Sequence, residues 1–166
     1  MPDYSIIVPV FNSSQSLDEL YSQIDHAMKG LHKSFRVIFV DDGSADSSWE
    51  KLSLLQQRIP DKVTAIRLAR NFGQHNATLC GIAQADGEYI VTIDDDLQNP
   101  PSEIARLINT MQETGADLVY GIPVNKKHSA ARNAGSKVLK KGSKRLFCTK
   151  GEGSSFRLMK SALAKN

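Results

Sequence analysis

Three consecutive carboxylates, Asp94, Asp95 and Asp96, come directly after an apolar run over residues 88–93. A short run of β-branched and aromatic residues predicts a buried strand. The carboxylates would then stand at its carboxyl end, where open α/β sheets bind their ligands. Three like charges side by side repel one another unless a cation relieves the repulsion, and hard cations prefer oxygen ligands. The cluster therefore indicates the binding of a divalent metal together with phosphate oxygens.

The same cluster also has a purely structural interpretation. Pro100, Pro101 and Ser102 open a helix a few residues later, and acidic residues are favoured near a helix N-terminus. One aspartate would satisfy that preference. Three in a row exceed it, so we favour the metal and phosphate chemistry.

A second acidic pair, Asp41 and Asp42, follows another apolar run and precedes Gly43 and Ser44. Asp, Gly and Ser are common turn residues, so this pair alone is weak evidence for a site. If both runs are parallel strands of one sheet, both acidic turns lie along the same edge. A carboxylate there can accept hydrogen bonds from a ribose hydroxyl or a base edge. The glycine-rich dinucleotide motif and the Walker lysine motif do not occur in the sequence, so a nucleotide would be held by carboxylates, a metal and an aromatic side chain.

Apolar runs that predict strands alternate with amphipathic stretches that predict helices. Strands are expected over residues 4–10, 35–40, 63–68, 89–93 and 116–120, and helices over residues 17–31, 49–59, 73–85 and 102–114. Ser16 and Glu19 form a capping-box signal for the first helix, and Asp46 and Ser47 are expected to cap the second. The alternation is typical of an α/β fold with a Rossmann-like, doubly wound, mostly parallel sheet. We expect one domain over residues 1–166, truncated C-terminally, because the chain ends soon after it enters another element.

Charge is distributed unevenly along the chain. The net charge is +3, yet residues 118–151 contain nine Lys or Arg and no acid, which leaves twelve basic and eighteen acidic residues elsewhere. A one-sided block over residues 121–150 is typical of a surface that meets phosphate, a membrane or nucleic acid, and a solvated helix face is the alternative. Nucleic acid is disfavoured, because the block has one aromatic residue, Phe147, and no nucleic-acid motif. Apolar runs all fall well short of the ~20 residues of a membrane span, so we expect a soluble chain.

Four segments together resemble inverting glycosyltransferases of family 2, which have the A-type nucleotide-diphospho-sugar fold. They are residues 8–12 (VPVFN), 40–44 (VDDGS), 70–74 (RNFGQ) and 94–101 (DDDLQNPP). The last two are similar to the narrower branch that moves a sugar onto a polyprenyl phosphate, with relatives such as dolichyl-phosphate mannose synthase and undecaprenyl-phosphate glycosyltransferases. The resemblance covers about residues 4–160.

The resemblance implies a set of nucleotide-binding residues. Pro9 and Phe11 would flank the nucleobase. Asp41 and Asp42 would bind the base or the ribose, and Arg70 would lie near the nucleobase pocket.

A second set, also implied by the resemblance, would carry the metal and the chemistry. Asp94 and Asp96 match the family's DxD motif and would bind the ribose and a Mg²⁺ or Mn²⁺ ion on the diphosphate. Gln98 would sit beside the diphosphate or the metal, so Asp96 and Gln98 are the catalytic candidates. The metal would stabilise the charge that builds up on the leaving diphosphate.

The acceptor implied by the resemblance is a polyprenyl phosphate. A phosphate monoester with a second pKa of ~6 is already ionised, so it needs cations more than a base. Lys126, Lys127 and Arg132 of the basic block are the candidates. The same block could rest on an anionic membrane surface, at the cytoplasmic face. The expected donor is a nucleotide-diphospho-sugar with UDP preferred over GDP, and a homo-oligomer is left open.

Three positions depart from the pattern of this branch. Pro123 stands where relatives carry an arginine for the donor phosphates, and Arg132 or a neighbouring lysine is the candidate replacement. Ser13 stands where a glutamate is frequent, and Ser155 stands where many relatives have an acid, with Glu152 nearby. We therefore assign no catalytic base. Two alternatives stay open: transfer to a glycan or protein hydroxyl, and a nucleotide- or metal-binding module without turnover.

Overall fold

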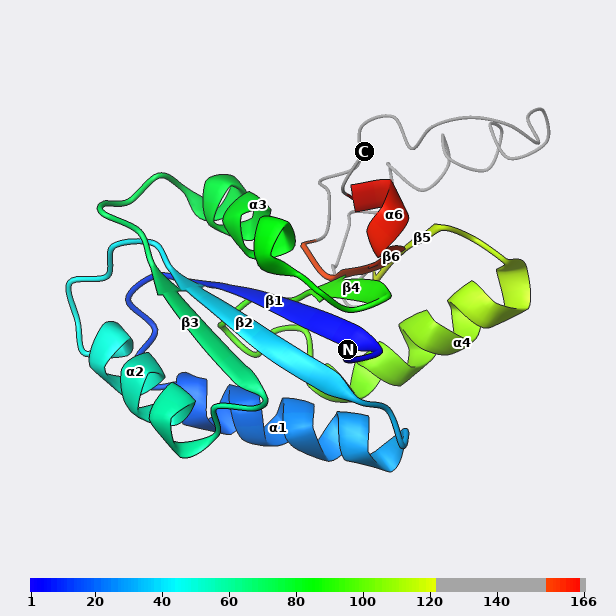
Figure 1. Ribbon diagram of the computed structural model, residues 1–166, viewed down its shortest axis with the longest axis horizontal. Helices are drawn as coiled ribbons and strands as arrows, with labels where there is room; N and C mark the ends of the chain where they lie inside the picture. The colour runs from blue at the N-terminus through cyan, green and yellow to red at the C-terminus, as the bar shows by residue number, and fades with distance from the viewer. Residues whose placement is uncertain (122–154, 165–166) are drawn as a thin grey trace, which may run out of the picture.

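The computed structural model describes residues 1–121 and 155–164, and in them one six-stranded sheet carries helices on both faces (Figure 1). The strands are β1 (Tyr4–Val10), β2 (Phe35–Asp41), β3 (Val63–Arg67), β4 (Tyr89–Thr92), β5 (Leu118–Tyr120) and β6 (Arg157–Lys160). Their order is β3-β2-β1-β4-β6-β5. Strands β1 to β4 are parallel, and β6 runs antiparallel to both its neighbours. The expected mostly parallel α/β sheet is confirmed. The basic block, apart from Gly121, lies outside the described residues.

Helices form two layers, one on each face of this sheet. They are α1 (Leu17–Gly30), α2 (Ser48–Arg58), α3 (Gln74–Gln84), the 3₁₀ turn η1 (Pro101–Glu103), α4 (Ile104–Thr114) and α6 (Ser161–Ala164). Buried residues of α1, α2 and α4 share one hydrophobic cluster, whereas α3 and α6 pack on the opposite face (Figure 1). Within the described part of the chain, no helix is both long and apolar enough to span a bilayer.

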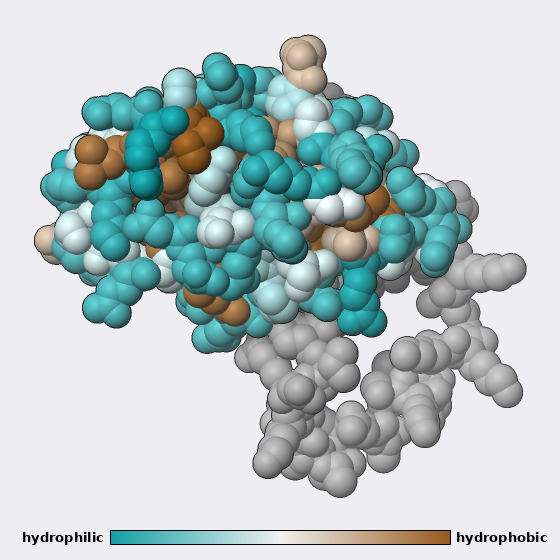
Figure 2. Space-filling model, turned by 90° about the horizontal axis from the view of Figure 1, so that it is seen from below, coloured by the Kyte–Doolittle hydropathy of each residue, from teal (hydrophilic) through white to brown (hydrophobic). Residues whose placement is uncertain are grey.

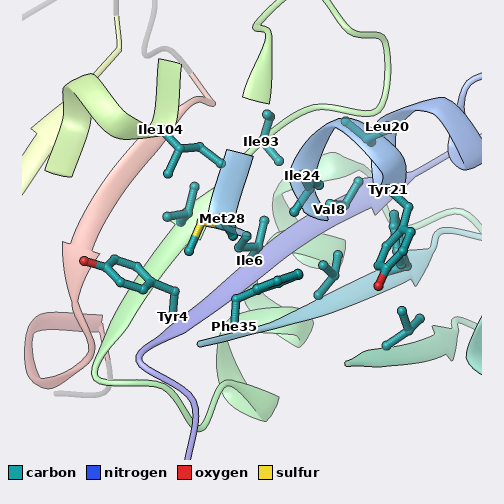
Figure 3. Packing of buried hydrophobic residues seen from close by; sticks show 14 of the residues in the cluster. Tyr4, Ile6, Val8, Leu20, Tyr21, Ile24, Met28, Phe35, Ile93 and Ile104 are labelled. Atoms are coloured by element: carbon teal, nitrogen blue, oxygen red, sulfur yellow. The ribbon is translucent and has the colours of Figure 1, made fainter. Parts of the chain in front are cut away.

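The central strand β1 is covered on both faces. Its residues alternate between the faces, as the two-residue period of a strand requires. Ile6 and Val8 pack with Ile24 and Met28 of α1 (Figure 3), whereas Ile7 belongs to the cluster under α3. All seven residues of β1 are buried. The strand is therefore a rigid base for the loop that follows it.

Helix α1 shows the amphipathic pattern that the sequence predicts. Its buried residues are Leu17, Leu20, Tyr21, Ile24 and Met28. They recur at helical spacing, so this apolar stripe of the helix faces the sheet and the opposite, polar side faces water. The outer face of the α1 and α2 layer is accordingly mostly hydrophilic, with apolar side chains scattered over it (Figure 2).

The capping-box prediction for α1 is wrong. Ser16 precedes the helix but makes no side-chain hydrogen bond to it. Its hydroxyl instead donates to the carbonyl oxygens of Ser13 (3.0 Å) and Asp95 (2.7 Å). A tertiary contact to the loop after β4 therefore replaces the local cap.

Sheet order reverses between β1 and β4. From β1 the chain moves outward to β2 and β3, then crosses back to place β4 on the other side of β1. Pairing of β1 with β4 ends at Ile7 and Thr92, whereas pairing with β2 continues through Pro9 and Val10. Pro9, which has no N–H to donate, therefore lies beyond the end of the β1–β4 pairing and is paired only with Val40 of β2. A crevice at such a switch point is the usual ligand site of open α/β sheets.

Strand β6 is an antiparallel insertion that the sequence did not predict. It lies between β4 and β5, with Arg157 opposite both Thr92 and Tyr120. Because β6 runs against β4, its first residue lies at the carboxyl end of β4. The insertion thus brings a distant segment to the edge where the acidic loops lie.

Candidate active site

A pocket of about 320 Å³ lies at the switch point, where the loops after β1, β2 and β4 meet the start of α3. It is lined by Pro9, Val10, Phe11, Asp42, Asn71, Gly73, Gln74, Asp94, Asp95 and Asp96. We call it the acidic pocket. Both aspartate clusters contribute to it, so their predicted convergence on one edge of the sheet is confirmed.

Asp42 fastens the loop before α3 to the end of β2. The side chain is 2% exposed. Its Oδ1 accepts a hydrogen bond from the backbone N–H of Phe72 (2.7 Å), and its Oδ2 accepts one from Gly73 (2.8 Å). Each carboxylate oxygen can accept a further bond, so Asp42 still has capacity for a ribose or base donor.

Gly43 allows this close approach of the two loops. Its φ of +72° is in the left-handed region, and a Cβ there would lie 2.7 Å from the carbonyl carbon of Arg70. A side chain at this position would both strain the backbone and push the loop away.

Asp41 does not line the acidic pocket. The residue is fully buried. Its Oδ1 accepts from the backbone N–H of Ser44 (3.2 Å). Its Oδ2 makes no hydrogen bond among the described residues and lies 3.5 Å from Nε of Arg67, an ion-pair distance. In this geometry Asp41 shapes the turn, and its contact with a nucleotide stays a prediction.

The three consecutive aspartates have three different surroundings. Asp95 points back to the loop after β1, where its Oδ2 accepts from the backbone N–H of Phe11 (3.1 Å). Burial raises the pKa of this carboxyl, and the hydrogen bonds from Ser13 and Phe11 oppose that rise only in part. Together with the bond from Ser16 to its carbonyl, these contacts make Asp95 the link between the two loops.

Asp94 is held by two neighbouring side chains. Its Oδ1 accepts from Nε2 of Gln74 (2.5 Å), and its Oδ2 accepts from the hydroxyl of Ser155. Asp94 therefore joins the start of α3 to the segment that leads into β6.

Asp96 is the most exposed of the three. Its Oδ1 accepts from the backbone N–H of Gln98 (3.0 Å), which leaves the rest of the carboxylate open. The side chain of Gln98 is exposed and does not line the acidic pocket. Its role beside a diphosphate stays a prediction.

The donor set fits a metal that is shared with a ligand. Among residues 1–121 and 155–164, no group of three His, Cys, Asp or Glu side chains is arranged to enclose a cation. Asp94 and Asp96 can supply one or two carboxylates. Mg²⁺ is commonly bound in this way, with waters and substrate phosphates completing its shell.

The walls of the acidic pocket also present apolar surface. Pro9 lines it, and Phe11 is 46% exposed, which leaves its ring available to a planar base. Arg70 does not line the pocket. Its guanidinium lies 4.9 Å from the centre of the Phe72 ring. The predicted acceptor cations, Lys126, Lys127 and Arg132, lie outside the described residues.

Hydrogen bonds fasten the loops after β1 and β2 to each other. The backbone N–H of Asn12 donates to the hydroxyl of Ser44 (2.9 Å). Asp46 accepts from the backbone N–H groups of Ser14 (3.0 Å) and Ser48 (3.0 Å). Partial burial works to raise the pKa of Asp46, but the bonds from Ser48 and Ser14 lower it to about 2. Asp46 thus accepts from the N–H of the first residue of α2, whereas Ser47, at the N-cap position, makes no side-chain capping bond.

A second pocket of about 370 Å³ adjoins the first. It shares Pro9, Gln74 and Asp94 with the acidic pocket and is further lined by His75, Thr78, Thr92, Ile93, Tyr120, Ser155 and Arg157. We call it the Arg157 pocket. The sequence did not indicate Arg157 or Tyr120 as site residues, because their positions depend on where β6 inserts.

Comparison with known proteins connects this geometry to a family. The family model for Glycosyl transferase family 2 matches residues 5–164. Undecaprenyl-phosphate 4-deoxy-4-formamido-L-arabinose transferase of Pseudomonas savastanoi pv. phaseolicola is 42% identical over 135 residues, which are 81% of this chain and 40% of that protein. The protein of the same name from Yersinia pestis is 40% identical over 135 residues, 81% of this chain and 41% of that protein. The chain thus spans about 40% of the length of these curated relatives.

Solved structures support the same fold. A mannosyltransferase from Pyrobaculum calidifontis in complex with GDP-Man and Mn²⁺ superposes with a TM-score of 0.73 at 19% identity, over 99% of this chain and 46% of that one. Glucosyl-3-phosphoglycerate synthase of Mycobacterium tuberculosis gives a TM-score of 0.67 at 20% identity, over 98% of this chain and 58% of that one. With the family model matched from β1 to α6 and an acidic pocket at the switch point of an A-type fold, the chain belongs to glycosyltransferase family 2.

Proposed function

We propose that this chain transfers a sugar from a nucleotide-diphospho-sugar to a polyprenyl phosphate, with inversion at the sugar carbon. The observation that carries the proposal is the acidic pocket, where Asp42 and the 94–96 cluster face one cavity at the switch point. The names of the relatives that are about 40% identical support the choice of acceptor.

The donor nucleotide would occupy the acidic pocket. Pro9 and the exposed ring of Phe11 offer apolar surface to a base. Asp42 and Asp94 offer carboxylate oxygens to ribose hydroxyls. Asp41 and Arg70 do not line the acidic pocket, so they would act indirectly, by holding the turn after β2 and the loop before α3. We expect UDP to bind in preference to GDP.

Mg²⁺ or Mn²⁺ would be held by Asp96, with Asp94 and Gln98 beside it. A bound divalent ion neutralises charge on the diphosphate as that group leaves. Asp95 takes a different part, because its hydrogen bond to Phe11 keeps the loop after β1 against the loop after β4. Within the cluster, Asp94 and Asp96 would thus bind the ligand, whereas Asp95 positions the loops.

The acceptor oxygen would attack the sugar from the side opposite the diphosphate. The bond from the acceptor's phosphate oxygen to the anomeric carbon forms, and the bond from that carbon to the donor's phosphate oxygen breaks with its electron pair leaving on the diphosphate. No proton needs to be removed, because the phosphate monoester is already ionised. A site without an assigned base is therefore sufficient for this acceptor.

The basic residues Lys126, Lys127 and Arg132 would contact the acceptor phosphate or the surrounding lipid headgroups. A block of one charge sign is attracted to an anionic membrane surface. We therefore expect the protein to work at the cytoplasmic face of a membrane.

The test is a calorimetric titration of the chain with UDP-glucose, UDP-GlcNAc and GDP-mannose, each with Mn²⁺, followed by a transfer assay on farnesyl phosphate. We expect at least one donor to bind and its sugar to reach farnesyl phosphate. Donor binding with transfer only to a sugar hydroxyl would show that the acceptor is a glycan rather than a polyprenyl phosphate. Donor binding without any transfer would indicate a nucleotide-binding module, and no binding of any donor would contradict the proposal.

A further inference from the structure

The Arg157 pocket differs from the acidic pocket in the charge that it presents. Its lining includes one guanidinium, that of Arg157, and one carboxylate, that of Asp94. The two oxygens of Asp94 already accept hydrogen bonds from Gln74 and Ser155. The Arg157 pocket therefore presents a positively charged side chain and lacks the cluster of carboxylates that lines the acidic pocket.

Arg157 is held in a fixed orientation at the edge of the sheet. It is the first residue of β6 and pairs with Thr92 of β4 and Tyr120 of β5. Its Nε donates to Oγ1 of Thr92 (3.2 Å), and that hydroxyl donates in turn to the carbonyl oxygen of Ser155. The two terminal nitrogens make no hydrogen bond or ion pair to any residue that the structure describes. A guanidinium fixed through Nε leaves a planar pair of donors for an oxyanion.

The start of α3 faces the same cavity. Gln74, His75 and Thr78 from the first turns of this eleven-residue helix contribute to the lining. The N-terminal end of a helix favours negative charge. The exposed imidazole of His75 adds a hydrogen-bond donor on this wall. Arg157 and the helix end thus approach the pocket from different elements.

We propose that the Arg157 pocket binds the phosphate monoester of the acceptor, with Arg157 as its charge partner and His75 as a second donor. This inference rests on the proposed function. The wall formed by Pro9, Gln74 and Asp94 belongs to both pockets, so a phosphate bound here lies next to a donor in the acidic pocket. Attack of one anion on a sugar carried by another requires this adjacency, with separate cationic partners for the two phosphate groups.

The donor's own diphosphate is a less suitable occupant of this pocket. Arg157 does not line the acidic pocket, where the carboxylates and Phe11 suit a nucleotide and its metal. An acceptor phosphate carries no base or ribose to satisfy those groups. The two occupants can therefore be separated by measuring each affinity on its own.

The experiment measures the affinity of farnesyl phosphate and of UDP with Mn²⁺ for the wild-type chain and for Arg157→Gln. We expect farnesyl phosphate to bind roughly ten- to hundredfold more weakly to Arg157→Gln, as the loss of a hydrogen-bonded charge implies. The affinity for UDP with Mn²⁺ should change less than about twofold, which also reports that the variant is folded. Arg157→Lys should restore only part of the affinity, because an ammonium lacks the planar pair of donors.

Lys160→Gln is the matched control, since Lys160 is a cation on the same strand that pairs with Asp117 (2.7 Å) and does not line the Arg157 pocket. It should leave both affinities unchanged. His75→Ala alters an exposed residue and should weaken farnesyl phosphate roughly two- to tenfold, which tests the pocket if Arg157→Gln does not fold.

Three results would overturn the inference, and they are distinguishable. Equal farnesyl phosphate affinity in wild type, Arg157→Gln and His75→Ala would exclude the Arg157 pocket as the acceptor site without contradicting the proposed function. Loss of UDP affinity in Arg157→Gln, with folding verified by circular dichroism, would assign Arg157 to the donor. A wild-type chain that binds UDP with Mn²⁺ but not farnesyl phosphate would contradict the acceptor class itself.

Discussion

The two pockets at the carboxyl end of β4 share a wall but differ in charge and in how their charged groups are held. The acidic pocket contains four carboxylates, those of Asp42 and of residues 94–96, and the Arg157 pocket contains one carboxylate and one guanidinium. In the acidic pocket four of the eight carboxylate oxygens accept hydrogen bonds from backbone N–H groups, and three of these bonds come from a neighbouring loop. In the other, the guanidinium is oriented by a threonine hydroxyl.

This difference indicates how one small surface can receive two anions. A diphosphate would be bound through a cation between it and the carboxylates, whereas a lone phosphate would meet a guanidinium directly. The shared wall keeps the two anions adjacent, and their separate partners limit the repulsion between them. The same carboxylates also fasten the loops, so the acidic pocket is the more sensitive of the two to substitution.

The largest effect is expected from Asp42→Ala. The change removes the carboxylate that accepts from the backbone N–H groups of Phe72 and Gly73, of which only Gly73 keeps another acceptor, Oδ1 of Asn71 (3.0 Å). We expect a loss of about 3 kcal/mol in the free energy of unfolding, because each bond to a charged group is worth ~1.5–3 kcal/mol. Urea denaturation measures it. Asp61→Ala, an exposed carboxylate in the turn before β3, is the control and should stay within ~0.5 kcal/mol of wild type. An equally small effect of both would show that Asp42 does not organise the acidic pocket.

Gly43→Ala should disturb the same pocket by steric means. Gly43 and Gly115 both have positive φ, but only at Gly43 would a Cβ meet neighbouring backbone, 2.7 Å from Arg70. The left-handed conformation alone costs about 1–2 kcal/mol for alanine, so Gly115→Ala reports that part. We expect Gly43→Ala to be more destabilising by at least ~1 kcal/mol and to weaken nucleotide binding, while farnesyl phosphate affinity is retained. Equal costs at the two positions would contradict the close loop contact.

A smaller effect, dependent on pH, is expected from the link between the loops after β1 and β2. The lowered pKa of Asp46, about 2, means that its ionised form is stabilised by folding. That contribution is fully present above the unfolded pKa of ~3.9 and is lost as the pH falls towards 2. The difference in unfolding free energy between wild type and Asp46→Asn should therefore shrink between pH 5 and pH 2. A difference that stays constant with pH would show that the carboxylate charge does not contribute.

Local sequence pattern was sufficient for the four parallel strands and for the convergence of the two acidic turns. Each strand is a short apolar run, and the aspartates follow two of these runs directly. The separate surroundings of Asp94, Asp95 and Asp96 could not be predicted, because three identical side chains in a row carry no sign of which loop each will contact. Ser16 likewise marked the helix start correctly, but its predicted capping bond does not form. Its hydroxyl donates instead to the carbonyl oxygen of Asp95, 79 residues away.

Strand β6 could not be predicted from the local sequence pattern, for a different reason. Its place between β4 and β5 depends on pairing across 65 residues, from Thr92 to Arg157. A short strand of mixed polarity gives no signal for a neighbour that distant. The Arg157 pocket follows from this pairing, which is why the sequence predicted the acidic pocket but not its neighbour.

The central claim is that the carboxylates of the acidic pocket bind the donor nucleotide through a divalent cation. Calorimetric titration of UDP into the chain, with Mn²⁺ and with EDTA, tests it on wild type and on Asp96→Asn, with Asp61→Asn as control. The account predicts binding by wild type and Asp61→Asn only when Mn²⁺ is present, and a loss of at least about tenfold in Asp96→Asn. Equal UDP affinity with Mn²⁺ and with EDTA, or unchanged affinity in Asp96→Asn, would contradict it.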